Sequence, residues 1–214
     1  MKKIGIIGSG IVGQTLAVGF IKHSYEVTIG TSNSKKLEEW QSNEGKNVSI
    51  KSFAETAASS NTLVLAVKGT VAKEVVETIG ASNLKGKTIL DATNPISDEE
   101  PENGVIKFFT NINKSLMEEL QETAPQANFV KAFSCIGSHF MIHPQFESKP
   151  SMFICGNNDE AKKEVSEINT LFGFETEDMG TVEAARAIEP LCMLWCIPGF
   201  RNNNWSHAFK LLKL

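Results

Sequence analysis

Residues 2–17, KKIGIIGSGIVGQTLA, run from an apolar strand through a Gly-x-Gly-x-x-Gly pattern into an amphipathic helix. In this context Gly8 allows a sharp turn off the strand, Gly10 leaves room for a pyrophosphate against the backbone, and Gly13 lets the helix pack on the sheet. The first turn of that helix has unpaired N–H groups and a positive dipole end, which favour phosphate. The stretch therefore predicts a dinucleotide site; a tight turn without a ligand is the less favoured interpretation.

The composition of the 214-residue chain is typical of a soluble globular protein, with 41% hydrophobic and 21% charged residues. No apolar run approaches the roughly 20 residues that a membrane-spanning helix needs. The apolar stretch at the N-terminus is a glycine-punctuated strand rather than a signal peptide. We therefore expect a cytoplasmic protein that does not bind membranes. The net charge of −4 argues against nucleic acid as a partner, because such binding needs a basic surface.

The four cysteines, Cys135, Cys155, Cys192 and Cys196, are not spaced as a disulfide framework or a zinc site. Cys192 and Cys196 lie four residues apart and share a face if that segment is helical, but no histidine accompanies them. We expect buried free thiols and no metal site.

Strand and helix patterns alternate along most of the chain. Expected strands cover residues 2–7, 25–29, 48–50, 62–67, 87–90, 128–133, 152–155 and 174–177. Expected helices cover residues 11–23, 34–41, 70–79, 114–123 and 159–171, with a short helix after Ser52. Ser34 and Thr70 are expected N-caps, and Ser52 with Glu55 has the spacing of a capping box. The alternation predicts an α/β fold with a doubly wound, mostly parallel Rossmann sheet.

A smaller region follows this sheet domain. We expect a dinucleotide-binding Rossmann domain over residues 1–150 and a small region over 151–214, which begins as α/β, becomes mainly helical and packs on the domain. Pro190 and Pro198-Gly199 are expected to interrupt the helices of residues 181–214. The apolar character of these C-terminal helices predicts a homodimer.

The regular pattern is lost between residues 96 and 111. Acidic residues gather there around Pro101, which predicts a solvated loop rather than a metal site. Long loops at the carboxyl ends of strands in an α/β fold often cover substrates.

The end of the second strand decides which dinucleotide is preferred. A site for NAD has an acidic residue about 20 positions after the glycines, where it binds the ribose hydroxyls; residues 29–36, IGTSNSKK, have none. Thr31, Ser32 and Asn33 can donate hydrogen bonds, and Lys35 and Lys36 supply positive charge, which suits a 2′-phosphate. We therefore expect NADP(H) to be preferred, with a plain polar turn as the alternative.

Two further strand ends complete the expected cleft. Ala66, Val67 and Lys68 follow the buried strand at 62–67, and Asn94 follows the strand at 87–90. Lys68 faces a phosphate or is an ordinary surface residue. The Asn94 amide orients the nicotinamide side or only initiates a turn with Pro95.

Several stretches together resemble a known family: the opening glycine pattern, Thr28-Ile29-Gly30-Thr31-Ser32, Leu65-Ala66-Val67, Asp91-Ala92-Thr93-Asn94-Pro95 and Val130-Lys131-Ala132-Phe133-Ser134. They are similar to the F420-dependent NADP oxidoreductases and their bacterial dinucleotide-binding relatives, and to the cytosolic domains of the six-transmembrane ferric reductases. The resemblance extends to the closing Arg186-x-x-Glu189-Pro190-Leu191 segment.

The resemblance implies hydride transfer between NADPH and a flavin-like acceptor, such as F420, FMN or FAD, with the two rings stacked in one cleft. Matching positions imply a pyrophosphate site at Gly8, Ser9, Gly10, Ile11 and Val12, a 2′-phosphate site at Thr31, Ser32 and Lys36, and a nicotinamide side at Ala66, Val67, Lys68 and Asn94.

No catalytic side chain is predicted, because hydride transfer between two rings needs alignment more than an acid or a base. His139 and His143 share a face if their segment is helical, as a proton-transfer pair or as surface residues; Ser134 and Cys135 end a strand nearby. Trp195, Phe200 and Trp205 form either an aromatic wall for the acceptor or part of the core.

Two other functions stay open from the sequence. One is reduction of an imine or a ketone, as in pyrroline-carboxylate reductases, which have a similar opening and need a proton donor. The other is an NADP-binding redox sensor without turnover.

Overall fold

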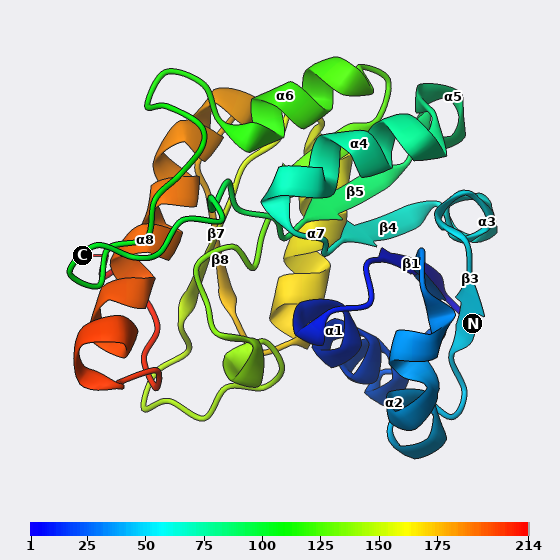
Figure 1. Ribbon diagram of the computed structural model, residues 1–214, viewed down its shortest axis with the longest axis horizontal. Helices are drawn as coiled ribbons and strands as arrows, with labels where there is room; N and C mark the ends of the chain where they lie inside the picture. Colours follow the sequence, from blue (N-terminus) through cyan, green and yellow to red (C-terminus); the bar gives the residue numbers. More distant parts are fainter. Residues whose placement is uncertain (214) are drawn as a thin grey trace.

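A six-stranded parallel sheet forms the centre of the computed structural model, which describes residues 1–213 (Figure 1). The strands lie in the order β3-β2-β1-β4-β5-β6. They are β1 Lys3–Ile7, β2 Glu26–Gly30, β3 Ser49–Lys51, β4 Thr62–Leu65, β5 Thr88–Asp91 and β6 Asn128–Lys131. The chain order reverses at β1, which pairs with both β2 and β4. This is the doubly wound Rossmann topology predicted from the sequence, and ligands bind at the carboxyl ends of the strands beside such a reversal.

Helices cover both faces of this sheet (Figure 1). One face is covered by α1 (Ile11–Lys22) and α7 (Asp159–Leu171), whose buried side chains share one core cluster with β1, β2 and β6. The other face is covered by α3 (Phe53–Ser59), α4 (Gly69–Ile79), α5 (Ala81–Leu84) and α6 (Leu116–Thr123). Each of the inner strands is therefore buried on both sides, which explains the continuous apolar run at β4.

A second, two-stranded parallel sheet adjoins the first. It consists of β7 (Ser151–Ile154) and β8 (Glu175–Asp178), which α7 connects. An antiparallel bridge between Lys131 and Cys155 joins this unit to the end of β6. Residues from β7 and α7 therefore share the core of the large sheet.

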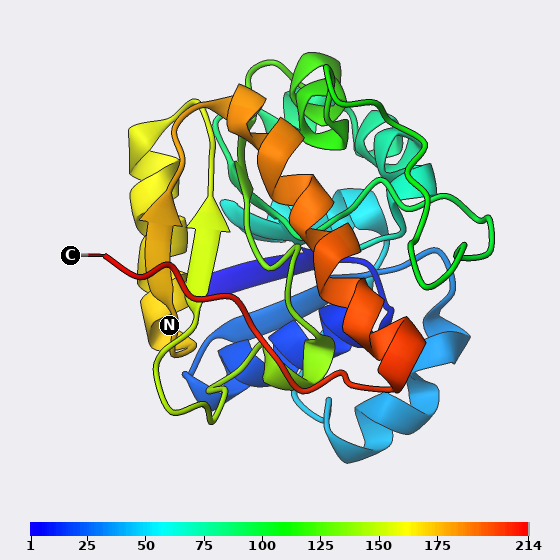
Figure 2. The same ribbon diagram turned by 90° about the vertical axis from the view of Figure 1, so that its left-hand side faces the viewer.

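The C-terminal segment differs from the expectation in two ways. After η3 (Val182–Ala184), α8 (Ala185–Asn202) runs unbroken through Pro190 and Pro198. A proline removes one backbone donor, and burial of one side of α8 against the domain outweighs that local cost. The mainly helical structure expected up to residue 214 is wrong for residues 203–213, which belong to no helix or strand; Phe209 O accepts from Ser151 N at the edge of β7 (Figure 2).

Helix starts differ from the expectation where side chains compete for the free N–H groups. The segment after β2 is a 3-10 turn, η1 (Ser34–Leu37), followed by α2 (Glu38–Asn43), and its cap is Asn33, not Ser34. Helix α4 begins at Gly69 after Lys68, not at a Thr70 cap. The Ser52 capping box is confirmed, and a second one, at Ser115 and Glu118, starts α6 two residues after its expected beginning.

The segment between β5 and α6 makes only isolated bridges, such as Ile96 with Phe108, as expected for a loop. Among residues 1–213, no helix combines the length and the apolar character that crossing a membrane requires.

Candidate functional site

A cleft with two lobes lies at the carboxyl ends of β1, β2, β4 and β5. The larger lobe has a volume of about 570 Å³ and the smaller about 260 Å³, and both include Val67 and Lys68. Residues of the larger lobe are Gly8, Ser9, Gly10, Thr31, Ser32, Lys36, Phe53, Ala66, Val67, Lys68, Val71, Glu74, Val75 and Thr78. Those of the smaller lobe are Val67, Lys68, Gly69, Ala92, Thr93, Asn94, Ile96, Ser97 and Asp98. The cleft brings together ten of the thirteen predicted site residues, all except Ile11, Val12 and Asn33.

The three motif glycines serve different purposes. Gly8 has φ of +127°, and a Cβ there would lie 2.3 Å from the Ala66 carbonyl oxygen. A Cβ on Gly13 would lie 2.4 Å from the Gly8 carbonyl oxygen. A Cβ on Gly10 would meet nothing within 4 Å, and the φ of −75° at Gly10 suits any residue. The fold therefore requires Gly8 and Gly13, whereas Gly10 leaves open space at the cleft.

The N-terminus of α1 opens onto this space. Among residues 1–213, no side chain caps the N-terminus of α1, and the first turn of the helix contains no acidic residue. The adjoining loop is held by Ser9, whose hydroxyl lies 2.9 Å from that of Thr31 and whose carbonyl oxygen accepts from Gln14 Nε2. Ile11 and Val12 are the first residues of this helix, so their backbone N–H groups have no intrahelical partner. An anion beside Gly10 would meet these donors and the positive end of the helix dipole.

The end of β2 forms the outer rim of the larger lobe. Ser32 and Lys36 are exposed there and Thr31 is half-buried. Asn33 serves a structural purpose instead, because its side chain accepts from Lys35 N and its own N–H donates to Thr31 Oγ1. Hydroxyl donors and an ammonium group thus share the rim with no carboxylate on this side.

The opposite wall of the larger lobe was not predicted. It consists of Val71, Glu74, Val75 and Thr78, all on α4, and Phe53 at the start of α3 faces the same lobe. Their spacing of three, four and seven residues is that of one helix face, so the sequence contains the signal. What it lacks is the information that this face borders a cleft instead of the core.

Asn94 ends the smaller lobe, next to Ala92 and Thr93. The Asn94 amide Nδ2 donates to the Ser134 carbonyl oxygen at 2.7 Å, which ties the turn after β5 to the turn after β6. At the entrance, Lys68 Nζ lies 2.7 Å from Asp98 Oδ1, so an exposed ion pair connects the cleft to the loop after β5.

Beneath the smaller lobe lies a group of buried charges. The Lys131 ammonium, with no exposed surface, lies 2.7 Å from Asp91 Oδ2 and 2.9 Å from Glu189 Oε1, and it donates to the Thr93 carbonyl oxygen at 2.8 Å. Burial alone would lower the pKa of Lys131, but the Asp91 and Glu189 carboxylates outweigh it and raise that pKa. We call these three residues the buried triad. The triad was not predicted from the sequence, although its members belong to the stretches that carry the family resemblance.

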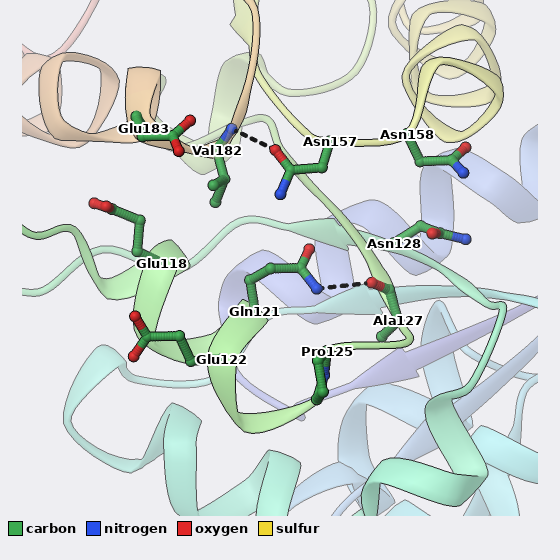
Figure 3. A pocket seen from close by; sticks show the side chains of 10 residues that line it. All are labelled: Glu118, Gln121, Glu122, Pro125, Ala127, Asn128, Asn157, Asn158, Val182 and Glu183. Carbon is green, nitrogen blue, oxygen red and sulfur yellow. Dashed lines mark hydrogen bonds between the residues drawn. The ribbon is translucent and has the colours of Figure 1, made fainter.

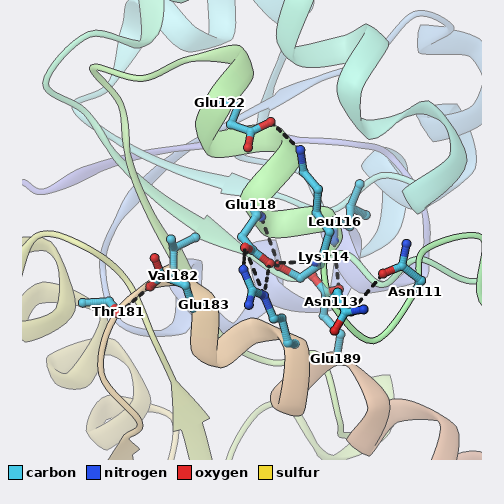
Figure 4. Close-up of polar contacts among 12 residues, drawn as sticks. Asn111, Asn113, Lys114, Leu116, Glu118, Glu122, Thr181, Val182, Glu183 and Glu189 are labelled. Carbon is cyan, nitrogen blue, oxygen red and sulfur yellow. Dashed lines mark hydrogen bonds and ion pairs between the residues drawn. The ribbon is translucent and has the colours of Figure 1, made fainter.

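Two carboxylates, those of Glu118 and Glu189, connect α6 to α8 (Figure 4). Glu189, on α8, accepts from Leu116 N and Met117 N at 3.0 Å each, which caps α6 from a distant part of the chain. Arg186, one turn earlier, binds Glu118 through Nε at 3.0 and 3.1 Å. These hydrogen bonds from Arg186, opposed by partial burial and helped by Ser115, lower the pKa of Glu118 to about 2.

The remaining candidate groups lie away from both lobes. His139 and His143 do not share a helical face, because the helical turn η2 covers only Ser138–Phe140. His143 Nε2 instead lies 2.9 Å from His23 Nε2. The pKa of His23 is lowered, chiefly by its partial burial and to a smaller extent by the charge of His143.

The cysteines are free thiols, as expected, and three of the four are buried. Trp195 packs on His207 and Trp205, with ring centroids 5.0 and 5.6 Å away, and Phe200 packs on Trp205. These aromatic rings pack on one another, and none is among the residues that line the two lobes.

A separate hollow of about 420 Å³ lies beside α6, at the amino end of β6 (Figure 3). Glu118, Glu122 and Glu183 face it. Their negative charge disfavours an anionic dinucleotide, and the hollow is remote from the carboxyl ends of the central strands.

The known proteins that this chain resembles are oxidoreductases. Residues 3–95 match the family model described as NADP oxidoreductase, coenzyme F420-dependent. The crystal structure of a candidate F420-dependent NADP reductase from Arthrobacter sp. FB24 is 29% identical, with a TM-score of 0.92 and coverage of 100% of both chains. Metalloreductase STEAP3 of Rattus norvegicus is 29% identical over 202 residues, which are 92% of this chain and 38% of that protein. The chain thus spans little more than a third of this curated relative.

At lower identity only the fold is shared. A reductive aminase from Aspergillus terreus in complex with NADPH and ethyl-5-oxohexanoate is 16% identical, with a TM-score of 0.67 over 91% of this chain and 60% of that one. The resemblance predicted from the sequence is confirmed by the family match and by the Arthrobacter structure. The chain is thus similar over residues 3–95 to the coenzyme F420-dependent NADP oxidoreductases, and over its whole length to the Arthrobacter protein.

Proposed function

We propose that this protein is an NADPH-dependent oxidoreductase that transfers a hydride between NADPH and a flavin-like acceptor, F420, FMN or FAD. The observation that carries the proposal is the open space at Gly10, beside the uncapped start of α1. Neither the fold nor the backbone conformation requires glycine at this position, so close approach of a ligand explains it. The match of residues 3–95 to the family model described as NADP oxidoreductase supports the same cofactor.

Different residues of the cleft would bind different parts of the cofactor. The N–H groups of Ile11 and Val12, with Gly10, would hold the pyrophosphate. Thr31, Ser32 and Lys36 would bind the 2′-phosphate, because the rim at β2 offers hydroxyl donors and an ammonium group. The smaller lobe, between Val67 and Asn94, would hold the nicotinamide side. The nicotinamide ring supplies the hydride, and the protein supplies alignment.

The acceptor is proposed from the family and from the chemistry of the lobe. A hydride passed between two aligned rings needs no acid or base, and neither His139 nor His143 lines the smaller lobe. An imine or ketone substrate would need a proton donor beside the ring, whereas the family match favours a flavin-like acceptor. Metal reduction, which the name of STEAP3 specifies, is not extended to this chain, since the two share only 38% of that protein's length.

The cofactor part of the proposal is tested with a matched pair of glycine variants. We expect Gly10→Ala to melt like the wild type but to bind NADPH at least about tenfold more weakly, equivalent to about 1.4 kcal/mol, because its methyl group enters open space at the cleft. Gly8→Ala is the contrasting variant and should lose stability, because its backbone is strained and its Cβ meets Ala66. Unchanged NADPH affinity in Gly10→Ala would contradict the proposed site.

The reaction is tested by following NADPH absorbance with F420, FMN and FAD in turn. We expect oxidation with at least one of them. A flat trace with all three, together with tight NADPH binding, would support a sensor without turnover instead. Oxidation only with small imines or ketones would favour the other reductase class.

A further inference from the structure

Thr93 is tied to buried charges through every polar group it has. Its backbone N–H and its hydroxyl donate to Asp91 Oδ1, at 2.9 and 2.6 Å, and its carbonyl oxygen accepts from Lys131 Nζ at 2.8 Å. Thr93 is almost fully buried, and together with Ala92 and Asn94 it lines the smaller lobe. The floor of this lobe is therefore set by Lys131 and Asp91, although neither of them lines the cleft.

We propose that Lys131, Asp91 and Glu189 are positioning residues, which set the Ala92–Asn94 floor so that the nicotinamide ring is held in one orientation. This inference rests on the proposed function, since it assigns the smaller lobe to the nicotinamide. The new element is that three side chains that do not line the cleft control the orientation of the nicotinamide ring in the smaller lobe.

The hydrogen bonds of the triad are directed at this turn. The Lys131 ammonium meets three oxygen atoms: it forms ion pairs with Asp91 and Glu189 and donates a hydrogen bond to the Thr93 carbonyl. Replacing any of these three groups would leave the ammonium less firmly held. On the far side of the turn, the Asn94 amide is held by the Ser134 carbonyl, so the floor is fixed from two directions.

Stability alone is a poor explanation for such a group. Taking charges out of water costs several kcal/mol per ion, and a buried ion pair is often no more stable than well-packed apolar residues of similar size. The triad has two carboxylates and one ammonium, so one negative charge is left over. The N-terminal N–H groups of α6 face Glu189 and offset this charge. The arrangement gives directional hydrogen bonds to Thr93 that apolar packing could not supply.

Glu189 also makes the floor dependent on α8. Its carboxylate bridges Lys131 and the start of α6, while Arg186 on the same helix holds Glu118. A displacement of α8 would therefore remove one of the three acceptors of Lys131. The orientation of the ring should respond to changes at Glu189, which lies outside both lobes of the cleft.

Two variants with conservative shapes test the inference. Thr93→Val removes the hydroxyl that binds Asp91 and leaves every charge in place, and Glu189→Gln keeps the size but removes one charge. Matched controls are Thr88→Val, at the other end of β5, and Glu183→Gln, on η3. Two quantities are measured: the affinity for adenosine 2′,5′-bisphosphate, which lacks the nicotinamide half, and the fluorescence anisotropy of the reduced nicotinamide in NADPH at saturating protein.

We expect both test variants to bind the bisphosphate within about twofold of the wild type, a difference of roughly 0.4 kcal/mol. The anisotropy of bound NADPH should fall toward that of a mobile ring in the test variants and stay at the wild-type value in the controls. Unchanged anisotropy in Thr93→Val would overturn the inference, even if Glu189→Gln fails to fold. Equal weakening of the bisphosphate and of NADPH would mean that the triad has only a structural role. If the wild type binds neither compound, the proposed function itself has failed.

Discussion

The two ends of the cleft are built in opposite ways. At the β2 end, Ser32 and Lys36 are exposed, and they belong to a short segment that follows the glycine motif. At the β5 end, the floor at Thr93 is held by Asp91, Lys131 and Glu189, which are buried and come from three distant segments.

In the proposed function, this difference separates the residues that select the cofactor from those that orient it. Exposed side chains at the β2 end can change without disturbing the core, so the cofactor preference that we propose for this end is independent of stability. The β5 end lies in the core, where one unpaired charge is costly. We therefore expect substitutions at the β5 end to change stability most, and substitutions at the β2 end to change affinity alone.

The largest effect is expected for Lys131→Met. Removing the ammonium leaves the Asp91 and Glu189 carboxylates buried together without a counter-charge, which should lower the free energy of unfolding by about 3–5 kcal/mol. Urea denaturation monitored by circular dichroism measures it. Lys107→Met is the control, because its pair with Glu99 is exposed and should contribute less than about 1 kcal/mol. Equal losses in the two variants would remove the distinction between buried and exposed ends.

A smaller effect, confined to binding, is expected for Lys36→Ala. Loss of a charged hydrogen bond to the 2′-phosphate should weaken NADPH binding by about 1.5–3 kcal/mol, with no change in NADH binding or in melting temperature. Lys35→Ala is the matched control, since Lys35 does not line the lobe. Titration calorimetry with both cofactors measures the difference. If NADH binds the wild type as tightly as NADPH, the assignment of the β2 rim to a phosphate is wrong.

The next smaller effect is expected for the contact between α6 and α8, whose contribution to stability should decrease in acid. The pKa of Glu118 is lowered from an ordinary value of 4.5 to about 2, chiefly by hydrogen bonds from Arg186. A carboxyl whose pKa is lower in the folded state stabilises it above the unfolded pKa and loses that contribution as the pH falls through the folded one. Arg186→Met should therefore be less stable than the wild type at pH 6, and the difference should shrink between pH 4.5 and about 2.

Thermal unfolding at several pH values measures this difference. Glu118→Gln serves as the control, because it removes the titrating group. A wild-type advantage over Arg186→Met that stays constant with pH would show that Glu118 is not the responsible group.

The smallest effect is expected at the entrance, for Asp98→Asn. The pair between Lys68 and Asp98 is short, but both side chains are mostly exposed. Pairs of this kind contribute about 0–1 kcal/mol and are screened by salt, so the melting temperature should change little and not at all in 0.5 M salt. A salt-independent loss above about 2 kcal/mol would show that the loop after β5 is anchored as firmly as the buried floor.

Residues that are close in the sequence were predicted well. The strand, the three glycines and the first helix lie within residues 3–22, and their boundaries follow from hydrophobic spacing. The rim at Thr31, Ser32 and Lys36 follows a strand directly, so its location at the edge of the sheet could be inferred. Asn33 shows the limit even here, because its side chain binds the adjacent backbone instead of facing the lobe.

By itself, the sequence determined the parallel sheet, the glycine-rich start of α1 and the residues of the β2 rim, since these depend on local spacing and on which side chains are present. Only the tertiary structure decided how Lys131, Asp91 and Glu189 meet beneath Thr93. Their contacts join segments up to about a hundred residues apart, and each residue alone reads as an ordinary charged residue. It also decided that α8 continues through two prolines, because burial of one side of the helix outweighs the local preference.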